Sequence, residues 1–150
     1  MPFRFRSGQV HLRRFRVDTG TEIRPGQLVC LSGDRLVPAS ELATAADVAA
    51  AFAGVSHQRS EVGESDPVSV DVSPLAVYEG DAEVGAYEVG DLLSVSVDAG
   101  PSDDELAVAI GPDEAIAMAA EFAEAGSSQL RVTFASTVCT ASSHQAARLG

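Results

Sequence analysis

The 150-residue chain has no lysine, and all ten of its basic residues are arginine. Without lysine it can offer neither the phosphate-binding lysine of a P-loop nor a lysine Schiff base. It also has no attachment point for biotin or lipoate, although the turn at Gly90 followed by Asp91-Leu92-Leu93 would suit a small carrier module. We therefore expect no cofactor.

Tryptophan is absent as well, and aromatic residues make up only 5% of the chain, so Val, Leu, Ile and Ala must build the core. Cys30 and Cys139 either form a disulfide between the two halves or are buried free thiols, and we expect the thiols. The three histidines lack the spacing of metal ligands, so we expect no metal site. No apolar run approaches the roughly 18 residues that cross a bilayer, so we expect no membrane contact.

Charge is distributed unevenly along the chain. Residues 1–24 contain six arginines and two acids, a net +4, whereas the whole chain carries −12, so residues 25–150 carry −16. A body this acidic is repelled by nucleic acid and by anionic membranes, and direct nucleic-acid contact is not expected. The cationic segment suits an acidic protein surface, either of a partner or of a second copy.

Alternation of apolar and polar residues predicts a mainly β protein, a small barrel or sandwich. Residues 68–72 give the clearest half-buried strand, and residues 130–134 alternate in the same way. Residues 3–17 predict one strand with an apolar and a cationic face, bulged at Arg13-Arg14. The arginines of its cationic face are the candidate contact residues: Arg4, Arg6, Arg13, Arg14 and Arg16.

Two Ala-rich segments predict one or two short helices. The first covers residues 40–53 and would end at Gly54, although an extended conformation before Gly54 is the alternative. The second covers residues 113–125, with Pro112 at its start and Gly126 at its end.

A glycine turn followed by a short apolar strand occurs twice, as IRPGQLVCLSGD in residues 23–34 and EVGDLLSVSVDAG in residues 88–100. Gly26 and Gly90 hold the same place in the two turns. A return strand, an Ala-rich stretch, a polar loop and an alternating strand then follow in each half. Either an internal duplication pairs two such units into a single compact barrel or sandwich, or two glycine turns are similar by chance.

Catalytic signatures are scarce. Ser56 and His57 are adjacent, and neighbouring strand residues point to opposite faces, so they do not form a nucleophile and base. The acids of the PSDDEL segment, Asp103, Asp104 and Glu105, are more typical of a solvated turn than of a cation loop. We expect no catalytic residues.

Several short motifs follow one another in a characteristic order: GQLV at 26–29, PAS at 38–40, FAGVS at 52–56, VSVDV at 68–72, GDLLSV at 90–95 and GSSQLRVTF at 126–134. Together they resemble the capsid decoration, or cement, proteins of tailed viruses. The resemblance spans about residues 20–134 and departs at Ser56 and in the arginine-rich segment. It implies a compact β-barrel, commonly a trimer on the outside of the capsid shell, without catalytic residues.

These observations lead to one principal hypothesis. Residues 1–19 form an arginine-rich arm, residues 20–135 a β-barrel domain and residues 136–150 a polar tail. The protein would be made in the host cytoplasm and would stabilise the virion surface by bridging major capsid subunits, as a homotrimer. The arm is either a tether to a neighbour or a strand of the protein's own sheet. The alternatives are a β-barrel module that binds peptide or carbohydrate, and a small hydrolase using His57.

Overall fold

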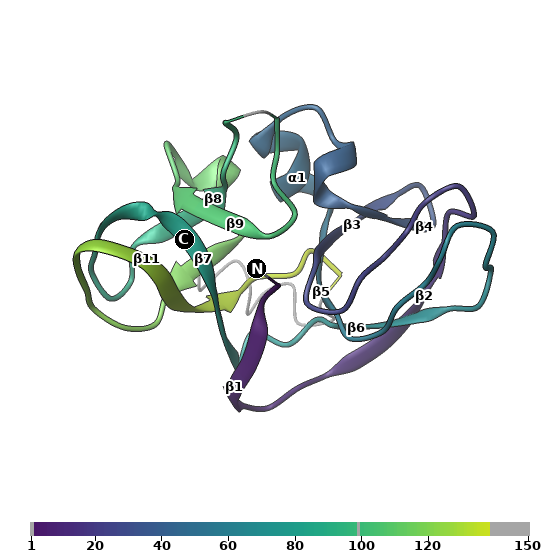
Figure 1. Cartoon of the computed structure of the whole chain (residues 1–150), viewed down its shortest axis with the longest axis horizontal. Coiled ribbons are helices and arrows are strands. Elements are labelled where there is room, and N and C mark those ends of the chain that lie inside the picture. Colours follow the sequence, from purple (N-terminus) through teal and green to yellow (C-terminus); the bar gives the residue numbers. More distant parts are fainter. Residues whose placement is uncertain (1, 99, 139–150) are drawn as a thin grey trace.

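The chain folds into two closed five-stranded barrels that lie side by side (Figure 1). The computed structural model describes residues 2–98 and 100–138. Around the first barrel the strand order is β2 (Leu12–Val17), β4 (Arg35–Pro38), β3 (Leu28–Ser32), β5 (Phe52–Ser56) and β6 (Val68–Asp71). Around the second it is β7 (Ala76–Tyr87), β9 (Glu105–Val108), β8 (Leu92–Val95), β10 (Ala117–Ala119) and β11 (Ala123–Phe134). The predicted mainly β class with a barrel is confirmed.

The two barrels have the same topology. In each, the first strand runs parallel to the third, and the other four neighbouring pairs are antiparallel. Gly26 and Gly90 precede the second strand of their barrels, with φ of 80° and 93°. The repeated glycine turns therefore belong to a structural repeat. The expectation that both copies share a single barrel was wrong, because each copy closes on itself.

The first predicted helix is shorter than expected. A 3-10 turn, η1 (Ala39–Glu41), precedes α1 (Ala45–Ala51), which begins after Thr44, whose Oγ1 accepts a hydrogen bond of 3.1 Å from the Asp47 amide. The chain becomes extended at Phe52, as the alternative interpretation held. Gly54 is not a helix cap but lies inside β5, where a Cβ would overlap the main-chain oxygen of Asp71.

The second predicted helix, at residues 113–125, was wrong. Only η2 (Pro112–Glu114) is helical, and β10 and the start of β11 follow it. Residues 117–119 lie between two neighbours, β8 and β11, and hydrogen-bond to both. Alanine favours a helix by only a few tenths of a kcal/mol per residue over most residues, so ladder bonds and burial on a barrel strand outweigh it.

Residues 3–17 form two strands instead of one. β1 (Arg4–Gly8) pairs with β7 beside the second barrel, whereas β2 pairs with β4 and β6 in the first. The irregularity lies between Phe5 and Ser7, and not at Arg13-Arg14. The arginine segment is thus part of the protein's own sheets. Removal of residues 1–17 would take β2 out of the first barrel, in agreement with the alternative that this segment is a strand of the protein's own sheet.

The larger of two apolar clusters extends across the junction of the barrels. Successive residues of β3 and β5 point to opposite faces. Val29 and Ala53 belong to a cluster within the first barrel, while Leu28 and Phe52 join the larger cluster that fills the second. α1 packs against η2 across the junction, above the barrels in Figure 1. Among the described residues no helix is long and apolar enough to cross a membrane.

Candidate functional site

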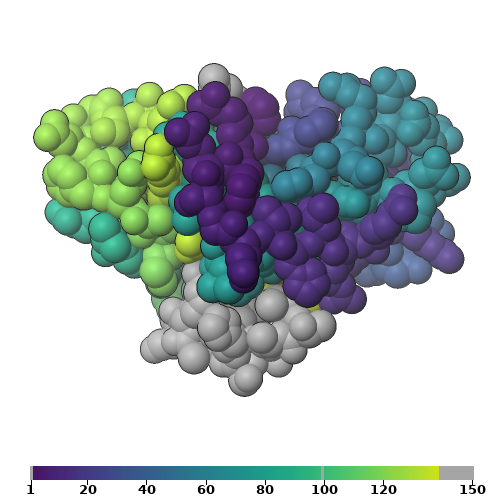
Figure 2. Space-filling view, turned by 90° about the horizontal axis from the view of Figure 1, so that it is seen from below, coloured from purple at the N-terminus to yellow at the C-terminus, as the bar shows by residue number. Residues whose placement is uncertain are grey.

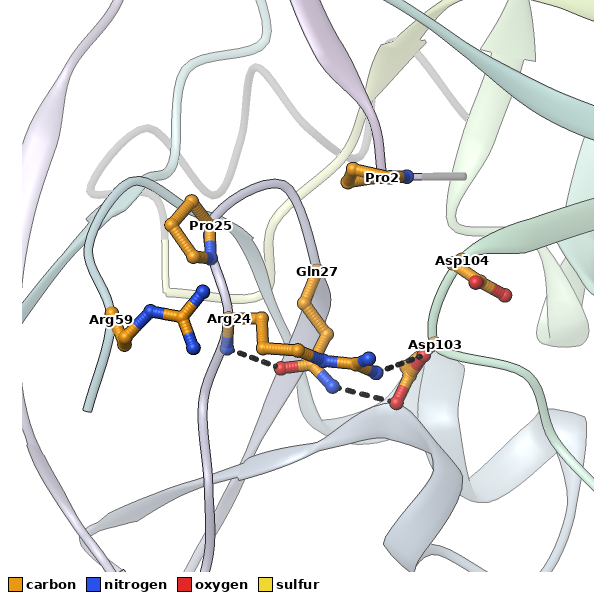
Figure 3. Close-up of a pocket in the computed structure, with 7 residues that line it drawn as sticks. All are labelled: Pro2, Arg24, Pro25, Gln27, Arg59, Asp103 and Asp104. Carbon is orange, nitrogen blue, oxygen red and sulfur yellow. Dashed lines mark hydrogen bonds and ion pairs between the residues drawn. The ribbon is translucent and has the colours of Figure 1, made fainter. Parts of the chain in front are cut away.

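A cavity of about 230 Å³ opens where loops of the two barrels meet (Figure 3). We call it the inter-barrel pocket. The first barrel contributes the loop before β3 and the loop after β5, and the second contributes the loop before β9. The lining residues are Pro2, Arg24, Pro25, Gln27, Arg59, Asp103 and Asp104.

Several hydrogen bonds hold Asp103 in place in this pocket. Its carboxylate accepts hydrogen bonds from Gln27 Nε2 at 2.7 Å and from Ser40 Oγ at 3.0 Å. Its main-chain oxygen accepts from the Leu28 amide at 2.8 Å. Gln27 is itself only 4% exposed, and its Oε1 accepts from the Arg24 amide at 2.9 Å. The acidic side of the pocket is therefore held rigidly between the two barrels.

The two arginines of the pocket are held less tightly. The Arg24 guanidinium lies 3.9 Å from carboxylate oxygens of both Glu22 and Asp103, which is too long for a hydrogen bond. Within the described part of the chain, Arg59 has neither an ion pair nor a hydrogen-bonded partner. In Figure 3 its guanidinium extends toward Arg24 and Gln27.

A second polar group connects the barrels through buried side chains. Tyr78 Oη donates to Asp71 Oδ2 at 2.6 Å, and His57 Nε2 lies 2.6 Å from the same Tyr78 oxygen. Because the Tyr78 proton is directed to Asp71, His57 Nε2 must be the donor in its own bond. The amides of His11 and Ser73 donate to Asp71 Oδ1 at 3.0 and 2.9 Å. These hydrogen bonds connect the segments that contain His11, His57 and Tyr78 to the buried carboxylate of Asp71.

Ser56 does not combine with His57 as a nucleophile with its base. Its Oγ donates to the Arg24 main-chain oxygen and accepts from the Gln27 amide at 3.2 Å, while the His57 ring turns to Tyr78. Both hydrogen bonds of the Ser56 hydroxyl therefore stabilise the loop before β3. Ser56 and His57 therefore provide no nucleophile for the hydrolase alternative.

Burial shifts the ionisation of three groups. It raises the pKa of the Cys30 thiol to about 12, and this thiol donates to the Val48 carbonyl. Cys30 is free, as expected, whereas Cys139 lies outside the described residues. Burial also raises the pKa of Tyr78, and the hydrogen bond and negative charge of Asp71 raise it further. The pKa of Tyr87 is raised by burial and then by the charges of Glu83 and Glu105.

Three carboxylates that are distant in the sequence gather beside the second barrel. The oxygens of Glu83, Asp98 and Glu105 lie within 4.8 Å of one another, a spacing at which they could hold a divalent cation. Ser96 Oγ donates to Glu83 at 2.7 Å. Only Glu105 belongs to the acidic run seen in the sequence, so this cluster could not have been predicted from spacing.

The five candidate arginines are all exposed, two on β1 and three on β2, within the N-terminal segment that Figure 2 shows in purple. Arg4 pairs with Glu79 at 3.2 Å. Arg13 and Arg14 instead donate to the main-chain oxygens of Val138 and Pro67, at 2.9 and 3.0 Å. Among the described residues Arg6 and Arg16 have no ion pair. Within the described part of the chain, four of the five arginines therefore have no ion-paired carboxylate.

Apolar side chains are also exposed in the N-terminal segment and next to it. Phe5, Val10, Leu12 and Leu75 are 37–57% exposed, and the last three line a shallow groove. We define the N-terminal surface as the five arginines together with these four apolar residues. Along the apolar face of residues 3–17, Phe3 and Val17 are buried in this chain, whereas Phe5, Val10 and Leu12 are exposed.

The protein-family models and curated proteins compared with this chain gave no match. The functional assignment therefore depends on the surfaces and on the motifs in the sequence.

Sequence reasoning missed the inter-barrel pocket. Its residues come from three loops and from the segment before β1, and they meet only when both barrels are closed. Gln27 directly follows the repeated turn glycine and its side chain reaches Asp103 of the other barrel, but nothing local in the sequence indicates this contact.

Proposed function

We propose that the protein is a non-enzymatic structural component of a virion, which binds the outside of the capsid and bridges major capsid subunits. The N-terminal surface makes the contact. The observation that carries this proposal is the combination of exposed apolar side chains with arginines that form no ion pair among the described residues, on an otherwise acidic protein.

The composition of the N-terminal surface supports a protein interface. Exposed apolar side chains that lie together mark interaction sites, and arginine and aromatic residues are enriched in interface cores. Phe5 is 43% exposed although its ring packs edge-on against Tyr78 with centroids 5.8 Å apart. Covering these side chains would remove apolar area from water, at about 25 cal/mol per Å².

The charge of the surface indicates an acidic partner. A guanidinium binds a carboxylate through two parallel hydrogen bonds and is more weakly hydrated than an ammonium group. Arg6 and Arg16 are both exposed and can reach a partner without breaking an ion pair. Nucleic acid is a poorer partner, because residues 25–150 carry −16 and would repel it.

β1 offers a second mode of contact. It is the terminal strand of its sheet and pairs with β7 alone among the described strands. Such an edge can accept a strand from a neighbouring chain. A copy of the same protein could also use it, and self-association as a homotrimer at the virion surface is part of the proposal.

The test is co-sedimentation with capsid shells of the encoding virus from which this protein has been stripped. We expect Arg6→Glu with Arg16→Glu to weaken shell binding by about tenfold, since each exposed pair contributes up to about 1 kcal/mol. The matched control is Arg24→Glu with Arg59→Glu, which changes the net charge equally but outside the N-terminal surface. For the apolar part, Leu12→Ser is compared with Val84→Ser, whose parent side chain is 72% exposed outside the N-terminal surface.

Three results would contradict the proposal. The first is equal shell binding by the two double variants. The second is binding that is lost after nuclease treatment of the shells, which would indicate nucleic acid as the partner. The third is an arginine-dependent trimer that never binds shells, which would make a second copy the only occupant of the N-terminal surface.

A further inference from the structure

We infer that one end of the second barrel binds a segment of another protein that carries arginine or lysine together with apolar side chains. We call this surface the acidic end and define it by three exposed apolar residues and four acids: Val89, Ile110 and Phe122, with Glu88, Asp91, Glu121 and Glu124. It belongs to the barrel at the left of Figure 1 and shares no residue with the N-terminal surface. The inference goes beyond the proposed function, and only the choice of another protein over a second copy rests on that proposal.

Three connections between strands meet at the acidic end. They are the turn between β7 and β8, the chain that leaves β9, and the loop between β10 and β11. Main-chain hydrogen bonds of 2.9 Å join them, from the amides of Gly90, Ala119 and Ala109 to the oxygens of Ala119, Asp91 and Leu92 respectively. Ala123, the first residue of β11, pairs with Tyr87, the last residue of β7. Residues that are distant in the sequence therefore share this end of the barrel.

The acidic end exposes large apolar side chains. Val89 is 67% exposed, Ile110 94% and Phe122 58%. Exposed apolar side chains that gather on one surface mark places where a protein interacts with a partner. Covering them removes apolar area from water, so the partner must bring apolar groups of its own.

The charge of the second barrel sets the sign of the partner. Residues 76–134 contain 13 acids and one arginine, a net −12, which equals the net charge of the whole chain. That arginine, Arg131, is paired with Glu79 at 3.5 Å. Among the described residues, Glu88, Glu121 and Glu124 form no ion pair. The field of this barrel attracts cationic groups and repels anionic ones, so the partner is basic.

The combination of acids and apolar side chains favours a protein segment over a simple cation. Arginine and lysine lay their methylene groups along apolar surface while the charged group stays in contact with water. A simple cation supplies the charge but covers no apolar area. The N-terminal surface of a second copy has the required composition and is the competing occupant. Under the proposed function the capsid covers that surface, which leaves the acidic end to a different protein.

The experiment titrates the full chain into dye-labelled peptides and follows their fluorescence anisotropy. The probe is a short peptide in which arginine alternates with leucine. One control peptide alternates arginine with serine and keeps the charge, and the other alternates glutamate with leucine and reverses it. At about 0.15 M salt, where long-range attraction is screened, we expect the arginine–leucine peptide to bind about tenfold more tightly than the arginine–serine peptide. The glutamate–leucine peptide should not bind.

Apolar variants locate the binding surface. Phe122→Ser should weaken binding of the arginine–leucine peptide by about tenfold and Val89→Ser by about threefold. Val62→Ser is the matched control for Val89→Ser, because Val62 is 66% exposed on the loop after β5 in the first barrel. It should leave the affinity unchanged.

Charge variants are matched in the same way. Glu121→Gln with Glu124→Gln should weaken binding by about tenfold, since each exposed pair contributes modestly. Glu61→Gln with Glu64→Gln changes the net charge equally, at the same spacing, on the loop after β5. This control should bind the peptide as the parent does.

The inference fails if the arginine–serine peptide binds as tightly as the arginine–leucine peptide, because general charge attraction would then account for the binding. Equal affinities of the two double glutamine variants would overturn it as well. So would self-association in analytical ultracentrifugation that is abolished both by Phe122→Ser and by Arg6→Glu with Arg16→Glu, since the occupant would then be a second copy. Phe122→Ser should bind capsid shells as the parent does, so the shell assay tests the proposed function separately.

Discussion

At the scale of single residues, Tyr78 and Tyr87 are the chain's only tyrosines, and no tryptophan obscures their absorbance. Both lie on β7 and are at least 97% buried, with exposures of 3% and 2%. Their hydroxyls are used inside the protein, by Asp71 and by the Glu83 carbonyl. Their ionisation therefore reports directly on the integrity of the second barrel.

We predict that neither tyrosine ionises near its ordinary value of about 10 while the protein is folded. Both folded pKa values are raised, so the folded state retains protons that the unfolded state has lost. The free energy of unfolding must then fall as pH rises above about 10, and the stabilisation is fully present below that pH. Tyrosinate absorbance should appear together with the loss of far-UV circular dichroism. Reversible ionisation near pH 10 in a folded protein would contradict this prediction.

Among the secondary-structure elements, the two equivalent turns differ in what covers them. Gly26 and Gly90 both have positive φ, which costs an L-residue about 1–2 kcal/mol. A Cβ on Gly90 would meet nothing within 4 Å, whereas one on Gly26 would lie 2.6 Å from the Phe3 oxygen and 2.7 Å from Pro2 Cβ. The N-terminal segment is thus packed directly on the first turn.

We predict that Gly90→Ala lowers the free energy of unfolding by about 1–2 kcal/mol and that Gly26→Ala lowers it by clearly more. The additional loss arises because the Phe3 main chain must move away from its hydrogen bond of 2.8 Å to the Gly26 carbonyl. Urea unfolding of the two variants measures the difference, and Gly90→Ala serves as the control for positive φ. Equal losses would show that the segment before β1 does not press on the turn.

The elements also show how far the sequence could predict the fold. Alternation identified the strand at residues 68–72, and the paired glycine turns identified a repeat, because both depend on local geometry. The helix at 113–125 was wrong because the partners that hold Ala117–Ala119 extended are distant in the sequence. Similarly, nothing local to residues 3–17 indicates that β1 and β2 belong to different sheets. The inter-barrel pocket depends on the same long-range closure, and only its individual charges were visible beforehand.

In the whole molecule, the two barrels share their core. Leu28 and Phe52 belong to strands of the first barrel but pack in the cluster that fills the second. Thr137 returns to the first barrel after the last strand of the second, and its amide and hydroxyl both donate to the Phe52 carbonyl, at 2.9 and 2.8 Å. Neither barrel can lose its structure without exposing part of the other.

We predict that the barrels unfold in a single transition. Val29→Ala removes apolar contacts from the cluster of the first barrel, yet both tyrosines lie in the second. The near-UV signal of the tyrosines should therefore shift to lower temperature as far as the far-UV signal does. Val84→Ala, at a side chain 72% exposed, is the control and should move neither signal. Two separate melting steps, or a tyrosine signal unmoved by Val29→Ala, would contradict a shared core.

The return of the chain end to Phe52 has a consequence during synthesis. The first barrel leaves the ribosome first, but Thr137 and Val138 reach it only after all strands of the second barrel have been made. Until then the Phe52 carbonyl lacks the two bonds from Thr137, and the apolar outer faces of β3 and β5 are uncovered. A nascent chain that is stalled before residue 137 should therefore hold its first barrel in a less protected state than the finished protein does, and the addition of Thr137 and Val138 would complete the contacts of the first barrel.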